Sequence, residues 1–282
     1  MVPLKMNKNS LKNIATEVID LEINALKILK KSINKNFDRA VNLIVDCQSK
    51  IILCGVGKSG LIAAKIASTF SSVGSPAFSL SANDCLHGDL GSITKKDVLI
   101  LISNSGKSEE IIPIIKFANR NKIKLIGIVS KKSSFLYKAS DIKILLPEVK
   151  ESGLGVVPTS STSIQLAIGD DLSVAKLKKK QFSKYDFSRF HPGGNLGKLL
   201  KTVGDIMVSG KKIPFINENK NMKEALKTIS KKRLGVVIAQ NKKKNTTCII
   251  TDGNIRKLRQ KNIDFEKTMI KKVMTKNPIT IS

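Results

Sequence analysis

Residues Ile51–Gly60 read Ile-Ile-Leu-Cys-Gly-Val-Gly-Lys-Ser-Gly, an apolar β-type run that passes through a glycine-rich turn into a helical pattern. A strand that leads through such a turn into a helix N-terminus leaves unpaired backbone N–H groups and a favourable dipole for an anion. The pattern recurs where Val98–Ile102 leads into Ser103–Glu110, and a third Ser/Thr-rich turn covers Pro158–Ser163. These turns predict an enzyme that acts on a phosphorylated small molecule.

The region after residue 50 alternates short apolar strands with helical patterns. We expect strands at Ile51–Cys54, Ala77–Leu80, Val98–Ser103, Lys124–Val129 and Ile142–Leu146. The expected helices are Gly60–Ser71, Glu109–Asn119, Ser134–Ala139 and Ser160–Leu177. Uniformly apolar strands that alternate with helices indicate an α/β fold, a parallel five-stranded sheet sandwiched by helices. Ligands bind such sheets at the carboxyl ends of the strands, where all three turns fall.

Two further segments flank this region. Residues 1–46 predict two N-terminal helices, broken near Ser32–Asn36, that pack on the sheet domain of residues 47–200. The composition shifts near Val203, and residues 203–282 predict a small C-terminal α/β module. Its expected elements are a helix at Met222–Ser230, strands at Leu234–Ala239 and Thr247–Thr251, and a helix that ends at Gln260.

The composition limits the class of protein. The chain has 282 residues, 41% of them hydrophobic, and it has no apolar run long enough for a membrane span. The N-terminus is polar and Lys-rich, without the hydrophobic region of a secretion signal. Four cysteines lie scattered, without the spacing of a zinc site or a disulfide framework. A reduced, cytoplasmic setting is expected, with no membrane partner.

The net charge of +28 raises the question of nucleic-acid binding. The basic excess is spread along the chain, Lys outnumbers Arg, Trp is absent and aromatic residues make up only 4%. Aromatic platforms on which bases stack are therefore scarce. A Lys-rich solvated surface explains the charge better than a specific nucleic-acid site.

Several polar residues in the turns are suited to chemistry. The turn that contains Lys58 lacks the four-residue spacer of a Walker A loop. The Lys58 side chain either points at the substrate or is solvated. In the second turn the serine hydroxyls can bind phosphate or cap the next helix, with Ser105 or Ser108 as the cap and Glu109 or Glu110 completing a capping box. Both roles can hold for different serines. A carboxylate at Glu110 would repel a phosphate, so its place suits an acid or base.

The two histidines of the chain, His87 and His191, both lie beside glycine in expected loops. A histidine in a loop is often structural, but at the end of a sheet it can serve as general acid or base near neutral pH. Glu151 follows the fifth strand and adds a carboxylate before the third turn.

Seven stretches together resemble one known family. They are Gly55–Gly60, Gly74–Pro76, His87–Leu90, Ser103–Glu110, Pro158–Thr162, Gly169–Asp170 and His191-Pro192-Gly193-Gly194. In this order and spacing they resemble the sugar isomerase (SIS) fold, and within it the arabinose-5-phosphate isomerases of the Kdo-synthesis type. The resemblance implies interconversion of ribulose 5-phosphate and arabinose 5-phosphate without a required metal or other cofactor, by a homo-oligomer (a dimer or tetramer) with active sites built between subunits.

The resemblance also implies the site residues. The family's catalytic lysine, glutamates and histidine fall on Lys58, Glu110, Glu151 and His191. The implied substrate-binding residues are Gly57, Ser59, Gly74, Ser75, His87, Ser103, Asn104, Ser105, Ser108, Thr159, Ser160, Ser161 and Thr162. Aldose–ketose isomerisation moves a proton between C1 and C2 through an enediolate, which requires a base, an acid and a group that stabilises the oxyanion. Either glutamate could be the base.

Two departures from the family pattern are visible. Ser81 stands where some relatives carry a histidine proposed to touch inhibitory zinc, so we expect no zinc site there. The loop after Glu151 is also one residue shorter, which leaves the expected position of that carboxylate less well defined.

Residues 203–282 resemble a CBS module, opened by Val203–Met207 and closed by Ile250–Arg256. We expect a second repeat to begin at Lys272–Thr275 and to be truncated at Ser282. Asn254 stands where an acidic residue usually holds a ribose, so we expect weak or no nucleotide binding. An apolar pairing face in this module should be covered by another subunit.

Two other functions fit parts of the pattern. Another SIS-fold sugar-phosphate isomerase, such as one for a hexose phosphate, requires the same acid–base set. A sugar-phosphate-sensing regulator usually adds a helix-turn-helix domain, for which the N-terminal helices leave no room. The acid–base residues also favour the isomerase.

Overall fold

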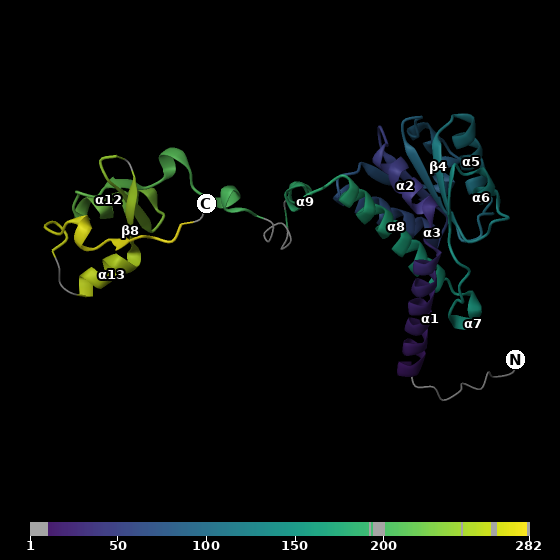
Figure 1. Ribbon diagram of the computed structural model, residues 1–282, viewed down its shortest axis with the longest axis horizontal. Helices are drawn as coiled ribbons and strands as arrows, with labels where there is room; N and C mark the ends of the chain where they lie inside the picture. The colour runs from purple at the N-terminus through teal and green to yellow at the C-terminus, as the bar shows by residue number, and fades with distance from the viewer. Residues whose placement is uncertain (1–10, 192, 194–200, 244, 261–263, 281–282) are drawn as a thin grey trace. The chain divides into compact units, whose positions relative to one another are not determined.

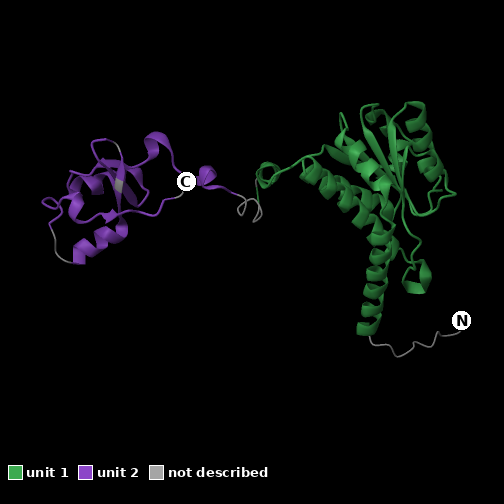
Figure 2. Ribbon diagram, viewed as in Figure 1, with its two compact units in different colours: residues 1–200 green, residues 201–282 purple. Residues whose placement is uncertain are grey.

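The computed structural model describes residues 11–191, 193, 201–243, 245–260 and 264–280. The chain divides into two compact units, residues 1–200 and 201–282, which Figure 2 shows in different colours. Among the described residues, no helix combines the length and apolar character needed to cross a membrane.

The first unit is built on a parallel sheet, as expected. Its strands are β1 (Ile51–Gly55), β2 (Ala77–Ser81), β3 (Val98–Ile102), β4 (Lys124–Val129) and β5 (Ile142–Leu145). They lie in the order β2-β1-β3-β4-β5, and every neighbouring pair is parallel. All residues of β1 and β3, at the centre of the sheet, are buried, which explains why their sequences are apolar without alternation.

Helices cover both faces of this sheet (Figure 1). The helices and short turns of the unit, in chain order, are α1 (Leu11–Ser32), α2 (Lys35–Val45), α3 (Lys58–Ser72), α4 (Ala82–Cys85), η1 (Asp89–Ser92), α5 (Ile111–Arg120), α6 (Phe135–Ala139), α7 (Gly153–Val156), α8 (Ser160–Lys179) and α9 (Lys184–Phe190). Alternate residues of each strand face opposite sides. Residues such as Leu53 and Ile100 pack with α1, α2, α3 and α8, whereas Ile52 and Leu101 pack with α4, α5 and α6.

Helix α1 is only partly supported by its own unit. Figure 1 shows it extending beyond the body of the sheet, and only Ala25 and Leu29 of its 22 residues are buried. Leu11 and Ile19 are more than half exposed although the helix is amphipathic. This face is apolar surface that the described residues of the unit do not cover.

The second unit contains a four-stranded mixed sheet of order β6-β7-β8-β9. Its strands are β6 (Phe215–Asn217), β7 (Val236–Gln240), β8 (Thr246–Thr251) and β9 (Thr275–Lys276). Its helical segments are α11 (Val203–Ile206), η2 (Gly210–Lys212), α12 (Met222–Lys232), α13 (Asp252–Gln260) and η3 (Ile270–Lys272). Met222, Val237 and Ile250 belong to its separate small core.

Candidate functional site

The carboxyl edge of the parallel sheet gathers most of the predicted site. Lys58 begins α3 after β1, Glu110 precedes α5 after β3, and Glu151 follows β5. His87 follows α4 beyond the end of β2. Because parallel strands end at one common edge, these side chains start from the same side of the sheet. The same edge carries Gly57, Ser59, Ser103, Asn104, Ser105, Ser108, Thr159, Ser160, Ser161 and Thr162.

The first turn is closed by glycines in close contact. A Cβ on Gly55 would lie 2.8 Å from backbone atoms of Ser59, and one on Gly60 would lie 2.8 Å from the carbonyl oxygen of Gly55. Helix α3 begins at Lys58, two residues before the expected start, so Lys58 occupies its first turn. The exposed Lys58 side chain makes no hydrogen bond or ion pair with a described residue. Its ammonium group is therefore available to a ligand.

The second turn is organised by its own serines. Ser103 Oγ accepts the backbone N–H of Gly106 at 3.0 Å, and Ser105 Oγ accepts that of Lys107 at 3.3 Å. The expectation that Ser105 or Ser108 caps the following helix is not met. Helix α5 begins at Ile111 with Glu110 at its N-cap and without a side-chain capping bond. The Glu110 carboxylate makes no hydrogen bond with a described residue, so its oxygens remain free to accept a proton.

The Glu151 carboxylate is held by the third turn. Its Oε2 accepts the backbone N–H of Thr159 at 2.8 Å, the Thr159 hydroxyl at 3.3 Å and the backbone N–H of Ser161 at 3.3 Å. Burial would raise the pKa of Glu151, but hydrogen bonds from Ser161 and Thr159 outweigh it and leave the pKa below its usual value. Glu151 is therefore an ionised group at the N-terminus of α8, where the helix dipole favours negative charge.

A buried glutamine joins the first turn to the third. Ser59 Oγ donates to Gln165 Oε1 at 3.1 Å, and Gln165 is only 1% exposed on α8. Sequence reasoning missed this residue. Gln165 could have been found in the sequence as a polar residue between Ile164 and Ile168, which both lie in the core. The Ser59–Gln165 bond places Lys58, at the start of α3, beside the N-terminal part of α8 that Glu151 caps.

Three predicted residues lie at the opposite, amino edge of the sheet. Gly74 and Ser75 precede β2, and Lys176 Nζ near the C-terminus of α8 donates to the Gly74 carbonyl at 3.4 Å. The Phe182 ring packs against Gly74 and stacks on Phe190, with ring centroids 6.1 Å apart. His191 follows Phe190 directly and so belongs to this edge. One chain alone does not bring these residues to Lys58, Glu110 and Glu151.

His191 is anchored to the end of α9. Its Nδ1 lies 2.8 Å from the Phe187 carbonyl oxygen, and its ring stacks on the Phe187 ring at a centroid distance of 3.8 Å. Phe187 was also missed by sequence reasoning, although a residue four positions before His191 shares its helical face. Of the motif that begins at His191, positions 192 and 194 lie outside the described residues.

In the described part of the chain, no group of three or more His, Cys, Asp or Glu side chains is placed to hold a metal ion. All four cysteines are free thiols.

In the second unit, Asn254 is already engaged by protein groups. Its Oδ1 accepts the Thr251 backbone N–H and hydroxyl, both at 2.9 Å. Its Nδ2 donates to the Val273 carbonyl and to Thr275 Oγ1, both at 3.3 Å. The side chain thus ties β8 to β9 and to the segment that leads into it, and position 254 carries an amide in place of a carboxylate that could accept ribose hydroxyls.

Comparisons with known proteins match both units. Residues 44–175 match the model of the SIS domain, and residues 203–261 that of the CBS domain. The arabinose 5-phosphate isomerase KdsD of Francisella tularensis is 42% identical over 277 residues, which cover 96% of this chain and 84% of that protein. KdsD of Yersinia pestis is 40% identical over 94% of this chain and 81% of its own length.

A solved structure agrees with the fold of the first unit. An Escherichia coli CFT073 protein in complex with arabinose 5-phosphate superposes with a TM-score of 0.64 at 34% identity. The match covers 66% of this chain and the whole of that one.

Proposed function

This chain belongs to the arabinose 5-phosphate isomerase family, with a SIS domain followed by a CBS domain, and on that premise we propose that it interconverts D-ribulose 5-phosphate and D-arabinose 5-phosphate. The observation that carries the proposal is the common edge shared by Lys58, Glu110 and Glu151 in a chain about 40% identical to such isomerases. The product would supply Kdo for lipopolysaccharide. Four free thiols fit a reducing, cytoplasmic location.

The proposed chemistry is proton transfer between C1 and C2 of the open-chain sugar. A carboxylate removes the carbon-bound proton, an enediolate forms, and the proton returns to the neighbouring carbon while the hydroxyl and carbonyl oxygens exchange a proton. Glu110 suits the base, because its carboxylate has no partner among the described residues, whereas Glu151 is held by Thr159 and Ser161. Lys58 would stabilise the negative oxygen of the enediolate.

The phosphoryl group fits the second turn better than the third. Glu151 already places a negative charge against the backbone N–H groups of Thr159 and Ser161, which disfavours a phosphoryl dianion there. The Ser103–Ser108 turn offers serine hydroxyl protons, because Ser103 Oγ and Ser105 Oγ accept backbone N–H groups of the turn and can still donate, and the exposed Lys107 adds a positive charge. The sugar hydroxyls would then extend toward the Ser59 and Thr159 turns.

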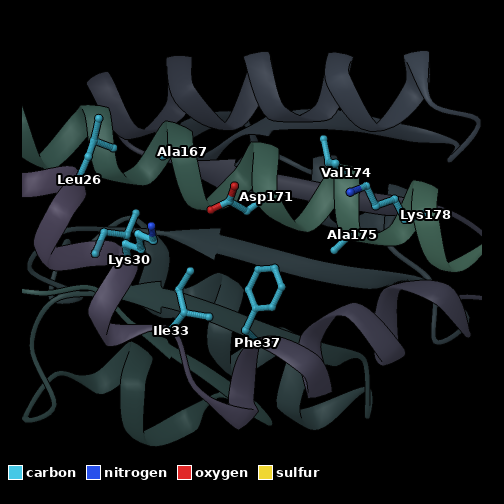
Figure 3. Close-up of a pocket in the computed structure, with 10 residues that line it drawn as sticks. Leu26, Lys30, Ile33, Phe37, Ala167, Asp171, Val174, Ala175 and Lys178 are labelled. Carbon is cyan, nitrogen blue, oxygen red and sulfur yellow. The ribbon is translucent and has the colours of Figure 1, made fainter. Parts of the chain in front are cut away.

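A homo-oligomer would complete this site. His191, Gly74 and Ser75 lie at the amino edge, so a second copy would have to present that edge to the residues of the carboxyl edge. The uncovered apolar face of α1 supports such an assembly. So does the groove of about 520 Å³ in Figure 3, lined by Leu26, Ile33 and Phe37 from α1, α2 and their connection and by Val174 from α8. We propose a dimer or a tetramer of two such dimers.

The deciding experiment incubates the purified chain with ribulose 5-phosphate and follows formation of the aldose. Glucose 6-phosphate and fructose 6-phosphate serve as control substrates, because a hexose phosphate isomerase would turn them over. Glu110→Gln and Glu151→Gln should each lower turnover, since general acid–base catalysis contributes roughly 10² to 10⁴ in rate. Near-normal turnover in both variants would contradict the proton-transfer scheme.

A further inference from the structure

The surroundings of His191 determine which of its nitrogens can act as a base. Helix α9 begins with a capping box in which Ser183 Oγ accepts the Asp186 N–H at 3.1 Å and Asp186 accepts the Ser183 N–H at 2.9 Å. This fixes the start of a seven-residue helix whose last carbonyls have no partner inside it. The imidazole of His191 forms a hydrogen bond with one of them, the carbonyl of Phe187.

The direction of that hydrogen bond follows from chemistry. A carbonyl oxygen can only accept, so Nδ1 of His191, 2.8 Å away, must carry the proton. In the neutral ring the proton is then on Nδ1 and the lone pair is on Nε2. The nearly parallel Phe187 ring, inclined by 13° with its centroid 3.8 Å away, restricts rotation of the imidazole.

We propose that Phe187 is a positioning residue: its carbonyl and ring hold His191 in the Nδ1–H tautomer and make Nε2 the single basic atom presented to the sugar. The inference rests on the proposed isomerase function. The step it assigns is ring opening of the cyclic sugar. Nε2 removes the proton of the anomeric hydroxyl, the bond between C1 and the ring oxygen breaks and the C1 carbonyl forms. The imidazolium then returns the proton from Nε2 to the former ring oxygen, so His191 ends the step neutral. Nδ1–H remains bonded to Phe187 throughout, so the imidazolium that forms stays at the end of α9, where the helix dipole favours a positive charge.

The tautomer is directly measurable, because the chain has only two histidines. Imidazole rings labelled with ¹⁵N in the otherwise deuterated full-length protein would give a long-range ¹H–¹⁵N correlation spectrum, recorded at a pH where His191 is neutral. His87→Gln removes the other ring and assigns the signals. We expect a protonated Nδ1 and a bare Nε2 for His191. A protonated Nε2 in the neutral ring would overturn the proposal.

Variants of α9 test the role of Phe187. Phe187→Ala removes the stacked ring and should give a mixture of tautomers, with kcat lowered by about ten- to a hundredfold and KM little changed. Phe187→Tyr keeps the ring and should restore both the tautomer and kcat. Tyr185→Ala is the matched control, since Tyr185 is an exposed aromatic residue of the same helix. Circular dichroism and thermal melts compare the folding of all variants.

The outcomes separate the two proposals. The spectrum needs no substrate, so a chain that fails to isomerise ribulose 5-phosphate would reject the proposed function and leave the tautomer result standing. An active enzyme in which Phe187→Ala changes neither tautomer nor kcat, or lowers kcat with the Nδ1–H tautomer intact, would reject the positioning role alone.

Discussion

The carboxylate of Glu151 accepts the backbone N–H of Thr159 at 2.8 Å and so closes the loop between β5 and α8. Glu151→Ala leaves the N–H groups of Thr159 and Ser161 without this acceptor, and we expect a loss of about 1–3 kcal/mol in the free energy of unfolding. Glu110→Ala should lose less, because the Glu110 side chain makes no capping bond. Denaturant unfolding of both variants checks the difference, and equal losses would contradict it.

A buried ion pair predicts a dependence of stability on pH. Asp97 accepts the Thr94 N–H at 2.6 Å and pairs with Lys50 at 3.0 Å. Burial would raise the pKa of Asp97, but hydrogen bonds from Thr94 and Lys50 leave it below the ordinary 3.8. A carboxyl group whose pKa is lower in the folded protein than in the unfolded chain stabilises the fold at pH values above its unfolded-state pKa. This contribution is lost as the pH falls through the folded-state pKa.

We therefore expect Asp97→Asn to destabilise the protein by roughly 2–3 kcal/mol at pH 7, with a smaller difference from the wild type below about pH 4. Glu148→Gln is the control, because Glu148 pairs with Lys131 at an exposed site and should cost under about 1 kcal/mol. Urea unfolding at several pH values measures both. If the difference in unfolding free energy between Asp97→Asn and the wild type stayed constant down to pH 3, the lowered pKa of Asp97 would be contradicted.

The close packing at the amino edge makes Gly74 sensitive to substitution. Its φ is +77°, and a Cβ there would lie 2.5 Å from the Phe182 ring. We expect Gly74→Ala to destabilise the protein by roughly 2–4 kcal/mol, through left-handed backbone strain and overpacking. Gly91→Ala should cost much less, since a Cβ there meets nothing within 4 Å. Thermal melts of the two variants should differ clearly.

The fold was predictable because short, largely apolar strands are separated by helical patterns, and the two strands β1 and β3 are apolar throughout. This alternation predicts the parallel sheet, and the structure confirms it, with helix ends that differ by a few residues. The start of α3 at Lys58 was missed, since Gly57 and Gly60 both read as turn residues and only the backbone shows that Gly57, with φ +56°, ends the turn.

The edges of the sheet were harder to assign. The family motifs group Gly74 and His191 with Lys58 as residues of one site. The hydrophobic periodicity of the sequence, however, does not indicate that α8 runs from the carboxyl edge of the sheet to its amino edge. That follows from the contacts of Glu151 at one end of α8 and of Lys176 at the other. The bond between His191 and Phe187 likewise depends on the exact end of a short helix, which sequence patterns locate poorly.

The engaged amide of Asn254 predicts the response to nucleotides. Because its Nδ2 donates to the Val273 carbonyl and its Oδ1 accepts from Thr251, we expect no micromolar binding of AMP or ATP in calorimetry with the full chain. Asn254→Asp would bring a carboxylate against the Val273 carbonyl and should lower the stability of the second unit by about 1–3 kcal/mol. Calorimetric binding of either nucleotide with a micromolar dissociation constant would overturn the expectation.

The separation of His191 from Glu110 predicts complementation between inactive variants. Glu110→Gln and His191→Gln should each be nearly inactive as pure proteins. When the two are unfolded together and refolded as an equal mixture, about half of the dimers combine one chain of each kind, and one of their two sites receives a native Glu110 and a native His191 from different chains. About a quarter of the wild-type activity should return. Sites completed within one chain would return none, because every chain of the mixture lacks one of the two groups.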